Sequence, residues 1–510
     1  MDPLIRRVAP VLLSALAGGA LSLAFPPRGW WWISLPAIAL FLLQTRRCEG
    51  VFSAVMTGLA FGLSFFGFLM PWLSELGLIA FIPPVTVLSV FPALYAVLMV
   101  RSVSLPPSRW WVRAVGGWAL MEWVRVRWPL GGLEWGMSGY ALSEWAPPRS
   151  AARWIGASGW TVLVVAAAAA LTLLALRHTR RGPAFRVAGV VALLLGLVLV
   201  GGSLWPTQTG GTVVRVAVVQ GNNPCPGEHC PNERYQIYQN HLRLTRTLQP
   251  GSVDLVIWPE GSTGSWTADP INAPEVGEAM GAEAARIGAV LLAGGDRPLN
   301  DTHWVNANVV FDQTGRIVSE YHKQHPVPYG EYIPARSLFK WVENLHADLP
   351  SRDMLRGEGP VLWDLGFGRF GSVISFEGSF ARYGRENARE GAGLLILATS
   401  QESYPYSVAS DQFIGITRMR AAELGMPLIH TAVTGRSTLI SPTGETGPRT
   451  ALAEEALLIG EVQTRAADQG PTLYVRLGDW VQTLAIASLG WEILHGMYRR
   501  RYPSRRRFPR

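Results

Sequence analysis

The sequence predicts two unlike parts: a polytopic α-helical membrane domain and an extracytoplasmic α/β domain. Three observations predict this class. The chain of 510 residues is 49% hydrophobic and only 16% charged, which is too apolar for an ordinary soluble protein. Residues 1–206 are mostly apolar runs broken by short polar joints. Residues 212–472 instead mix short β-branched runs with amphipathic segments, as α/β domains do.

Eight apolar runs approach the length of about 20 residues that a membrane-spanning helix needs. Seven fall within residues 1–206 and the eighth at residues 480–497; the second and fifth are the weakest. The runs are Val8–Phe25, Gly29–Gln44, Val51–Leu73, Leu78–Val100, Trp110–Val126, Trp154–Leu176, Val187–Leu204 and Trp480–Met497. Since six further runs follow the first within residues 1–206 and no small-residue cleavage site is evident, we expect the first run to stay in the protein.

Basic residues predict the orientation of these spans, because cytoplasmic loops are enriched in Lys and Arg. If every span crosses, one group of basic residues before, between and after the spans falls on a single side of the membrane. They are Arg6, Arg7, Arg46, Arg47, Arg101, Arg109, Arg177, Arg180, Arg181 and Arg186, followed after the last span by Arg499, Arg500, Arg501, Arg505, Arg506, Arg507 and Arg510. We therefore expect both termini in the cytoplasm, residues 498–510 as a basic tail, and residues 212–472 outside. The net charge of +8 then reflects topology rather than nucleic-acid binding.

Cys225 and Cys230 lie in "NNPCPGEHCPNE", on the predicted outer side, where thiols oxidise. Their position favours a local disulfide. A metal site is the weaker interpretation, because His229 is adjacent but no second cluster with ligand spacing occurs. Cys48, in a predicted cytoplasmic loop, is expected to be a free thiol. The sequence predicts no metal and no cofactor.

Within residues 212–472, strands alternate with helices and include one hairpin that turns at Asp312–Gly315. The expected strands are 213–222, 253–260, 289–296, 369–377, 394–400, 427–433, 437–444 and 456–463, with the hairpin at 303–325. The expected helices are 232–249, 273–288, 385–392 and 410–426. This alternation indicates α and β layers packed face to face, and about 260 residues suffice for a sizeable core.

Three polar residues follow apolar strands of this domain. Glu260 follows Trp258–Pro259, Lys323 follows the hairpin, and Ser375 ends "GSVIS". Each charged residue alone is most often a solvated charge at the rim of a sheet. Together they suit acyl chemistry, because a carboxylate can take a proton from a nucleophile and a lysine can stabilise the oxyanion.

The segments around these residues resemble the signatures of the nitrilase superfamily. They are "WPE" at 258–260, "YHKQHPVPYGEYIP" at 321–334, and a strand end that reads nucleophile, aromatic, glutamate at 375–377. Within the superfamily, nearly the whole chain is similar to the bacterial apolipoprotein N-acyltransferase family. The membrane part contributes "WALMEWVRVRWPLGGLEWGMSGYAL" at 118–142, and "RMRAAELGMPLIHTA" at 418–432 resembles the helix that follows the nucleophile. The resemblance implies a nitrilase-like (carbon-nitrogen hydrolase) domain, built as a four-layer αββα sandwich, between the seventh and eighth spans.

The resemblance also implies the activity and its residues. The family takes a fatty acyl chain from a phospholipid and transfers it to the α-amino group of an apolipoprotein's diacylglyceryl-cysteine, the last step of lipoprotein maturation. The implied location is the bacterial inner membrane, with the lipid bilayer, the phospholipid donor and the apolipoprotein acceptor as partners. By position, Glu260 is the general base, Lys323 stabilises the oxyanion and Ser375 holds the nucleophile's place. Glu331 and Glu377 match supporting carboxylates that orient the lysine.

The chain departs from the family pattern at several points. The family nucleophile is a cysteine, and a serine hydroxyl is a much weaker acid than a thiol. "TSQESYPY" at 399–406 replaces a segment that commonly contains Asn-Asp, "VTG" at 433–435 replaces "NNG", and "GSTG" at 261–264 is also unusual. Because several segments differ together, natural divergence is favoured over one engineered substitution.

Three interpretations remain open from the sequence. The first is a lipoprotein N-acyltransferase, and the second is a membrane-tethered amidase that acts on another carbon–nitrogen bond. The third is a relative that binds phospholipids or lipoproteins without turning them over. Glu260, Lys323 and Glu331 favour the two enzymes, whereas Ser375 and the altered segments favour the binding protein. His322 and His325 flank Lys323 without an evident catalytic role.

Overall fold

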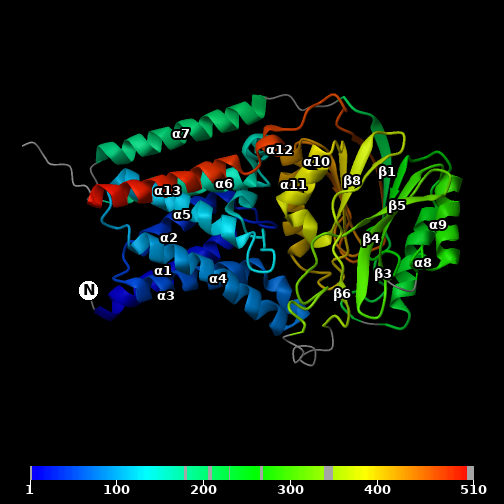
Figure 1. Ribbon diagram of the computed structural model, residues 1–510, viewed down its shortest axis with the longest axis horizontal. Helices are drawn as coiled ribbons and strands as arrows, with labels where there is room; N and C mark the ends of the chain where they lie inside the picture. The colour runs from blue at the N-terminus through cyan, green and yellow to red at the C-terminus, as the bar shows by residue number, and fades with distance from the viewer. Residues whose placement is uncertain are drawn as a thin grey trace, which may run out of the picture. The chain divides into compact units, whose positions relative to one another are not determined.

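The computed structural model describes residues 3–176, 181–204, 210–228, 230–264, 268–337 and 349–501 (Figure 1). It divides into a helical unit, residues 1–204 with 477–510, and an α/β unit, residues 205–476. Several residues used above lie outside the described ranges: Arg177, Arg180, His229, Arg505, Arg506, Arg507 and Arg510.

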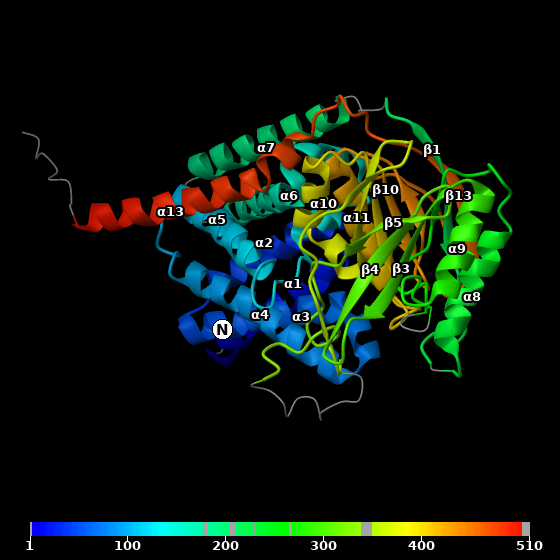
Figure 2. The same ribbon diagram turned by 45° about the vertical axis from the view of Figure 1, so that its right-hand side comes forward.

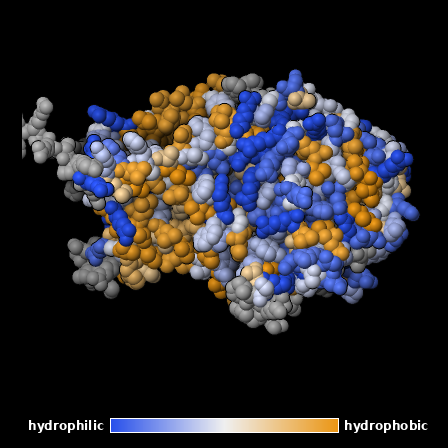
Figure 3. Space-filling model, viewed as in Figure 1, coloured by the Kyte–Doolittle hydropathy of each residue, from blue (hydrophilic) through white to orange (hydrophobic). Residues whose placement is uncertain are grey.

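The helical unit consists of long helices joined by short connections. They are α1 (Pro3–Ser22), α2 (Ser34–Thr45), α3 (Val51–Leu69), α4 (Leu78–Val100), α5 (Pro107–Arg125), α6 (Ala146–Ala175), α7 (Arg181–Leu204) and α13 (Trp480–Arg501). In the view of Figure 3, hydrophobic residues cover much of the outer surface of this unit. Such a surface is far more apolar than water tolerates on a soluble domain.

Four of the described helices are long and apolar enough to cross a membrane: α3, α4, α6 and the 182–204 stretch of α7. The apolar stretches of α1 and α2 are shorter. Helices α5 and α13, with 19 and 22 residues, are long enough but less apolar than these four, although the sequence predicts spans there. Both helices carry charged side chains among their apolar residues, which lowers their mean hydropathy.

The charges of α5 and α13 neutralise one another where the two helices meet. Glu492 of α13, only 6% exposed, contacts Arg109 at 2.6 Å and Arg113 at 2.5 Å. A Cβ atom on Gly116 of α5 would lie 2.6 Å from the carbonyl oxygen of Ala485, so the helices approach closely there. Pairing compensates charges that apolar surroundings would otherwise penalise.

The α/β unit contains two mixed sheets. In the first, the strand order is β13 (Ala456–Gln463), β1 (Val213–Gln220), β2 (Leu255–Ile257), β3 (Val290–Pro298), β4 (His303–Phe311) and β5 (Ile317–His322), with β6 (Asp353–Met354) beside β4. In the second, the order is β12 (Thr446–Arg449), β11 (Thr438–Ile440), β10 (Leu428–Ala432), β9 (Leu394–Thr399), β8 (Arg369–Ile374) and β7 (Leu362–Asp364). Strands β1, β2 and β3 run parallel, as do β8, β9 and β10, so each sheet has a parallel centre.

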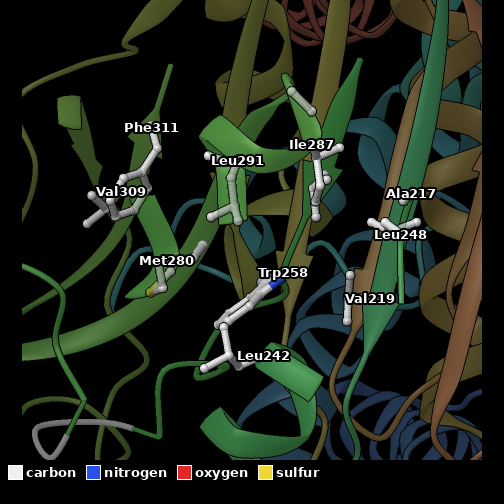
Figure 4. Packing of buried hydrophobic residues seen from close by; sticks show 14 of the residues in the cluster. Ala217, Val219, Leu242, Leu248, Trp258, Met280, Ile287, Leu291, Val309 and Phe311 are labelled. Atoms are coloured by element: carbon white, nitrogen blue, oxygen red, sulfur yellow. The ribbon is translucent and has the colours of Figure 1, made fainter. Parts of the chain in front are cut away.

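Two hydrophobic clusters hold these sheets. One combines side chains from both sheets, including Val218 of β1, Leu292 of β3, Phe370 of β8 and Ile396 of β9. The other joins the first sheet to α8 (Glu233–Arg246) and α9 (Pro274–Ile287), and Trp258 lies within it (Figure 4). Helices α10 (Ala381–Arg389) and α11 (Ala409–Leu424) flank the second sheet (Figure 2), and the short α12 (Leu473–Leu477) follows β13. Apolar side chains on both faces of each sheet explain why their strands read as apolar runs.

Some element boundaries differ from the sequence prediction. The strand expected over 369–377 ends at Ile374, because Ser375 adopts a left-handed φ of 51° and 375–379 form a 3-10 turn. Helix α10 begins at Ala381 and ends at Arg389, earlier at both ends than the predicted 385–392. The strand predicted at 437–444 covers only 438–440, and the short strands β6, β7 and β12 were not predicted because edge strands of two to four residues carry little periodicity.

Cys225 and Cys230 form a disulfide bond, which confirms the predicted local bridge, and Cys48 is a buried free cysteine. The bridge closes the segment between β1 and α8. Within it, the amide of Glu228 donates to the carbonyl oxygen of Cys225 (3.0 Å). The bridge therefore fixes a short turn between two elements of the α/β unit.

We expect a thiol reagent applied to the unreduced, denatured protein to label Cys48 alone, because the bridged cysteines have no free thiol. Peptide mass spectrometry locates the label, and a reduced sample serves as the control in which all three cysteines react. Labelling of Cys225 and Cys230 without reduction would contradict the bridge.

Candidate active site

Glu260 stands just beyond the end of β2, on a rigid support. Trp258, two residues earlier, is fully buried, and its indole N–H donates to the Thr245 hydroxyl of α8 (2.8 Å). On the neighbouring strand, a Cβ atom on Gly294 would lie 2.7 Å from Cα of Glu260. Only glycine permits this approach. The backbone of Glu260 is thus pressed against β3.

The carboxylate of Glu260 receives hydrogen bonds from three directions. Its Oε1 accepts from Asn306 Nδ2 of β4 (2.7 Å) and from Lys323 Nζ (3.3 Å). Its Oε2 accepts from the backbone N–H of Ser400, just beyond β9 (3.1 Å). With 7% of its surface exposed, Glu260 is oriented by its neighbours rather than by solvent.

Lys323 lies just beyond β5 and is 1% exposed. Its backbone N–H donates to the carbonyl oxygen of Asn306 (2.9 Å), and its Nζ contacts Glu331 Oε1 at 2.5 Å as well as Glu260. Glu331 is itself fixed, because its Oε2 accepts from the N–H of Val327 (2.7 Å). The predicted partners Glu260, Lys323 and Glu331 are therefore in direct contact.

Two opposing effects act on the charge of Lys323. Burial alone would lower the pKa of Lys323, but the carboxylates of Glu260 and Glu331 outweigh burial and raise it above its ordinary value. Burial also raises the pKa of Glu331, while Lys323 acts in the opposite direction. The ammonium group thus stays charged in a site where an oxyanion would need it.

Ser375 occupies the first position after β8. Its φ of 51° lies in the left-handed region, which is uncommon for a residue other than glycine, and its side chain is partly buried. Within the described ranges, no residue hydrogen-bonds the Ser375 hydroxyl. Strained backbone of this kind clusters at functional sites, because surrounding structure must hold it in place.

The Glu377 carboxylate ties the turn of Ser375 to the chain around Lys323. Glu377 is fully buried; its Oε2 accepts from the amide of Ile374 (2.9 Å) and the hydroxyl of Tyr321 (2.7 Å). Its Oε1 accepts from the amides of Gln324 and His325. Glu377 therefore joins the end of β8 to the chain just after Lys323. Of the two predicted supporting carboxylates, Glu331 is the one that contacts the lysine ammonium.

Neither histidine beside Lys323 is arranged as a base for Ser375. His322 contacts Glu320 at 2.7 Å. His325 lies 4.4 Å from Phe380, ring centroid to centroid, and its Nδ1 is 3.0 Å from the Tyr383 hydroxyl. Burial lowers the pKa of His325 to about 3, so it is neutral.

The sequence prediction missed several residues of the site. Asn306 orients Glu260, and its signal was a polar residue at a buried position of a strand. Asp296 of β3 is another, and burial together with Glu260 and Glu331 raises the pKa of Asp296 to about 7. Ser400 lies in an altered segment and holds Glu260 through its backbone N–H. Every residue except proline has such a group, so the residue type gives no signal.

The two altered segments touch one another. The carbonyl oxygen of Ser400 accepts from the N–H of Thr434 (3.3 Å). A Cβ atom on Gly435 would lie 1.9 Å from Oε1 of Gln401. Residues 399–406 and 433–435 thus form one continuous patch beside Glu260, and a change in one constrains the other.

The buried Glu–Lys–Glu cluster and the left-handed Ser375 thus stand at strand ends of an α/β unit with two mixed sheets. A family model described as carbon-nitrogen hydrolase matches residues 215–470, and one described as apolipoprotein N-acyltransferase N-terminal domain matches residues 17–170.

Curated relatives match over nearly the full length. The chain is 30% identical to "Apolipoprotein N-acyltransferase" of Bradyrhizobium diazoefficiens, covering 93% of each chain. It is 27% identical to the protein of the same name from Geobacter metallireducens, covering 92% of this chain and 91% of the relative. The chain belongs to the apolipoprotein N-acyltransferase family. Among solved structures, a carbon-nitrogen hydrolase from Helicobacter pylori matches 56% of this chain and 95% of its own at 18% identity and a TM-score of 0.37.

We expect Lys323→Met to destabilise the fold by about 3–5 kcal/mol, because it leaves two buried carboxylates without their cation. The loss should be larger at about pH 8 than at about pH 5. Burial and mutual repulsion raise the pKa values of carboxyl groups left in this way, so the folded variant binds protons more tightly than the unfolded chain and loses stability as pH rises. Unfolding temperatures in detergent at both pH values measure this, with Arg316→Met, at an exposed turn, as the control. An equal loss at both pH values would contradict the electrostatic account.

Proposed function

We propose that this protein transfers a fatty acyl chain from a phospholipid to the α-amino group of the N-terminal diacylglyceryl-cysteine of an apolipoprotein. Its membership of the family supports this activity. The observation that carries the proposal is the direct contact of Lys323 with Glu260 and Glu331 at the strand ends. A buried charged cluster of this kind is costly to keep unless it works.

In the first half-reaction, the Ser375 hydroxyl attacks the ester carbonyl of the phospholipid. Glu260 accepts the hydroxyl proton, and the Lys323 ammonium stabilises the tetrahedral oxyanion. The bond between the carbonyl carbon and the glycerol oxygen then breaks, and Glu260 returns the proton to that oxygen. A lysophospholipid leaves, and the acyl chain remains on Ser375 as an ester.

In the second half-reaction, the neutral α-amino group of the acceptor attacks the acyl ester. Glu260 takes a proton from the amine, and the same oxyanion position is used. The Ser375 oxygen leaves with that proton, and an amide bond is formed. Each group thus returns to its starting state.

The second candidate function is binding without turnover, and a specific observation favours it. Ser375 replaces the cysteine of the family pattern, and the adjoining segments 399–406 and 433–435 are altered together. A serine hydroxyl needs stronger activation than a thiol, and a lone carboxylate activates it weakly. The contacts of Glu260, Lys323 and Glu331 favour the enzyme.

We further propose the arrangement of the whole chain. Residues 1–206 would form a membrane domain of seven helices, residues 212–472 a four-layer αββα sandwich outside the cytoplasm, and 480–497 an eighth span that leads into the tail 498–510. Four long apolar helices and the arginines between spans support the membrane part. The two hydrophobic clusters support the sandwich. The proposed site of action is the inner membrane of a bacterial cell.

The direct test incubates the purified protein with phospholipid vesicles and a diacylated lipopeptide, and looks for the triacylated product by mass spectrometry. We expect the product with the unmodified protein and its loss with Ser375→Ala, because no other nucleophile takes part in the mechanism. A diacylated peptide that stays unchanged, with vesicles or peptide still bound, would establish the binding function instead.

We expect Ser375→Cys to raise acyl transfer about tenfold or more, because a thiolate is far more accessible than an alkoxide near neutral pH. A hydroxylamine-sensitive thioester should then form at position 375, and Glu260→Ala or Lys323→Ala in the same background should abolish it. A folded Ser375→Cys variant that forms no thioester would show that the altered segments have closed the pocket to acyl donors.

The proposed topology predicts where a reporter that is active only outside the cytoplasm will work. Fused after Gly210 it should be active, and fused after Arg510 it should be silent, since the first position precedes the outer domain and the second ends the basic tail. Colony assays of the two fusions, with expression checked by immunoblot, decide the orientation. Activity at the second position alone would reverse it.

A further inference from the structure

Glu402 is joined to Glu260 by hydrogen bonds that pass through Ser400. Glu402 lies in the altered segment 399–406, and its side chain is 14% exposed. Its Oε2 accepts from the hydroxyl of Ser400 (2.9 Å), and its own backbone N–H donates back to that hydroxyl (3.3 Å). The Ser400 hydroxyl is therefore held by both the side chain and the backbone of Glu402.

Ser400 in turn holds the base. Its backbone N–H donates to Glu260 Oε2 (3.1 Å), on the side of the carboxylate opposite to Asn306 and Lys323. This contact fixes the direction of the Glu260 carboxylate from the side that Asn306 and Lys323 leave open. The path from Glu402 to Glu260 passes through a single residue.

The disulfide-closed segment holds Glu402 from both of its flanks. On one flank, Asn223 Nδ2 donates to Glu402 Oε1 (3.2 Å), and Asn223 is itself fixed by the amide of Cys225, which donates to its Oδ1 (2.8 Å). On the other flank, Arg234 of α8 lies 3.9 Å from Glu402 Oε2. The bond between Cys225 and Cys230 sets the distance between these two flanks.

Packing brings the same segments together. Gly227, inside the disulfide-closed turn, lies against Pro405 of the altered segment: a Cβ atom there would be 3.6 Å from Pro405 Cγ. Asn223, which donates to Glu402, is itself buried, with 7% of its surface exposed. The turn and the altered segment are therefore neighbours as well as hydrogen-bonded through Asn223 and Glu402.

We propose that Glu402 is a positioning residue for the general base, acting through Ser400 on Glu260, and that the Cys225–Cys230 turn is the support that keeps Glu402 in place. This proposal rests on the proposed function for its catalytic meaning, but its structural content concerns the Glu260 carboxylate alone. Glu402 does not touch the reacting atoms.

The test follows the Glu260 carboxyl carbon by nuclear magnetic resonance, in full-length protein labelled with [5-13C]glutamate in detergent. The Glu260→Gln variant assigns the signal. Glu402→Ala and Glu402→Gln both remove the charge of Glu402, but only the alanine variant releases Ser400, because glutamine keeps an oxygen for the Ser400 hydroxyl. We therefore expect the titration midpoint of the Glu260 signal to lie about one pH unit higher in Glu402→Ala than in Glu402→Gln.

Three further variants sharpen the result. Ser400→Ala removes the hydroxyl but keeps the backbone N–H, and should move the midpoint in the same direction as Glu402→Ala without adding to it in the double variant, as two members of one path would. Cys225→Ser with Cys230→Ser should cause a smaller shift of the same sign. Glu445→Gln, at an exposed turn, is the matched control and should cause none.

A merely structural role would lower the unfolding temperature of Glu402→Ala while leaving its Glu260 midpoint equal to that of Glu402→Gln, and that outcome overturns the proposal. If Glu402→Ala does not fold, the Glu260 titration midpoints of Ser400→Ala and Glu402→Gln test the proposal instead. When acyl transfer is measured alongside, the acid limb of its pH–rate profile should follow the midpoint. If neither the unmodified chain nor any variant transfers an acyl chain, the proposed function is wrong. The Glu260 resonance would still show whether Glu402 positions Glu260.

Discussion

The site depends on one buried interaction, the ammonium group of Lys323 between the carboxylates of Glu260 and Glu331. A charge taken from water into a protein interior loses several kcal/mol of hydration, to an order of magnitude, and regains it only with well-placed partners. Here each partner is fixed in turn: Asn306 and Ser400 hold Glu260, and the amide of Val327 holds Glu331. The cluster therefore constrains strands that are far apart in the sequence to end at one place.

The two sheets supply that place. The parallel centres of both sheets direct the carboxyl ends of β2, β8 and β9 toward the site, which is where ligands bind in many α/β folds. Glu377 joins the end of β8 to the chain beside Lys323, so that the left-handed turn at Ser375 is held against its own strain. If Ser375 is the nucleophile, as proposed, fixing its backbone in this way lowers the entropy lost when a substrate reaches it.

The sequence predicted the parts of this arrangement that local patterns encode. The apolar runs predicted strands that end just before Glu260 and Lys323. The hairpin turn at Asp312–Gly315 also lies where its residues predicted. The strand before Ser375 was predicted too long, because Phe376 follows the apolar residues Val373 and Ile374 closely and only the backbone dihedral of Ser375 reveals the turn. Glu377 was expected to orient the lysine, and its contacts are instead with backbone amides and Tyr321. The contact of Ser400 with Glu260 spans 140 residues and uses a backbone N–H, so no residue type could signal it.

The segments that depart from the family pattern contact one another, which explains why they differ together. Segment 399–406 holds Glu260 through Ser400, touches 433–435 through Thr434 and Gly435, and meets the disulfide-closed turn through Glu402 and Pro405. A substitution in any one of these segments leaves a cavity or an unpaired polar group in its neighbours unless they change as well. Concerted change is thus the expected consequence of replacing the Asn-Asp segment. Ser375 thus differs from the family pattern in a chain whose segment 399–406 also holds Glu260 through Ser400 and Glu402. Under the proposed function, the activity of this chain would depend on Ser400 and Glu402 as well as on Glu260.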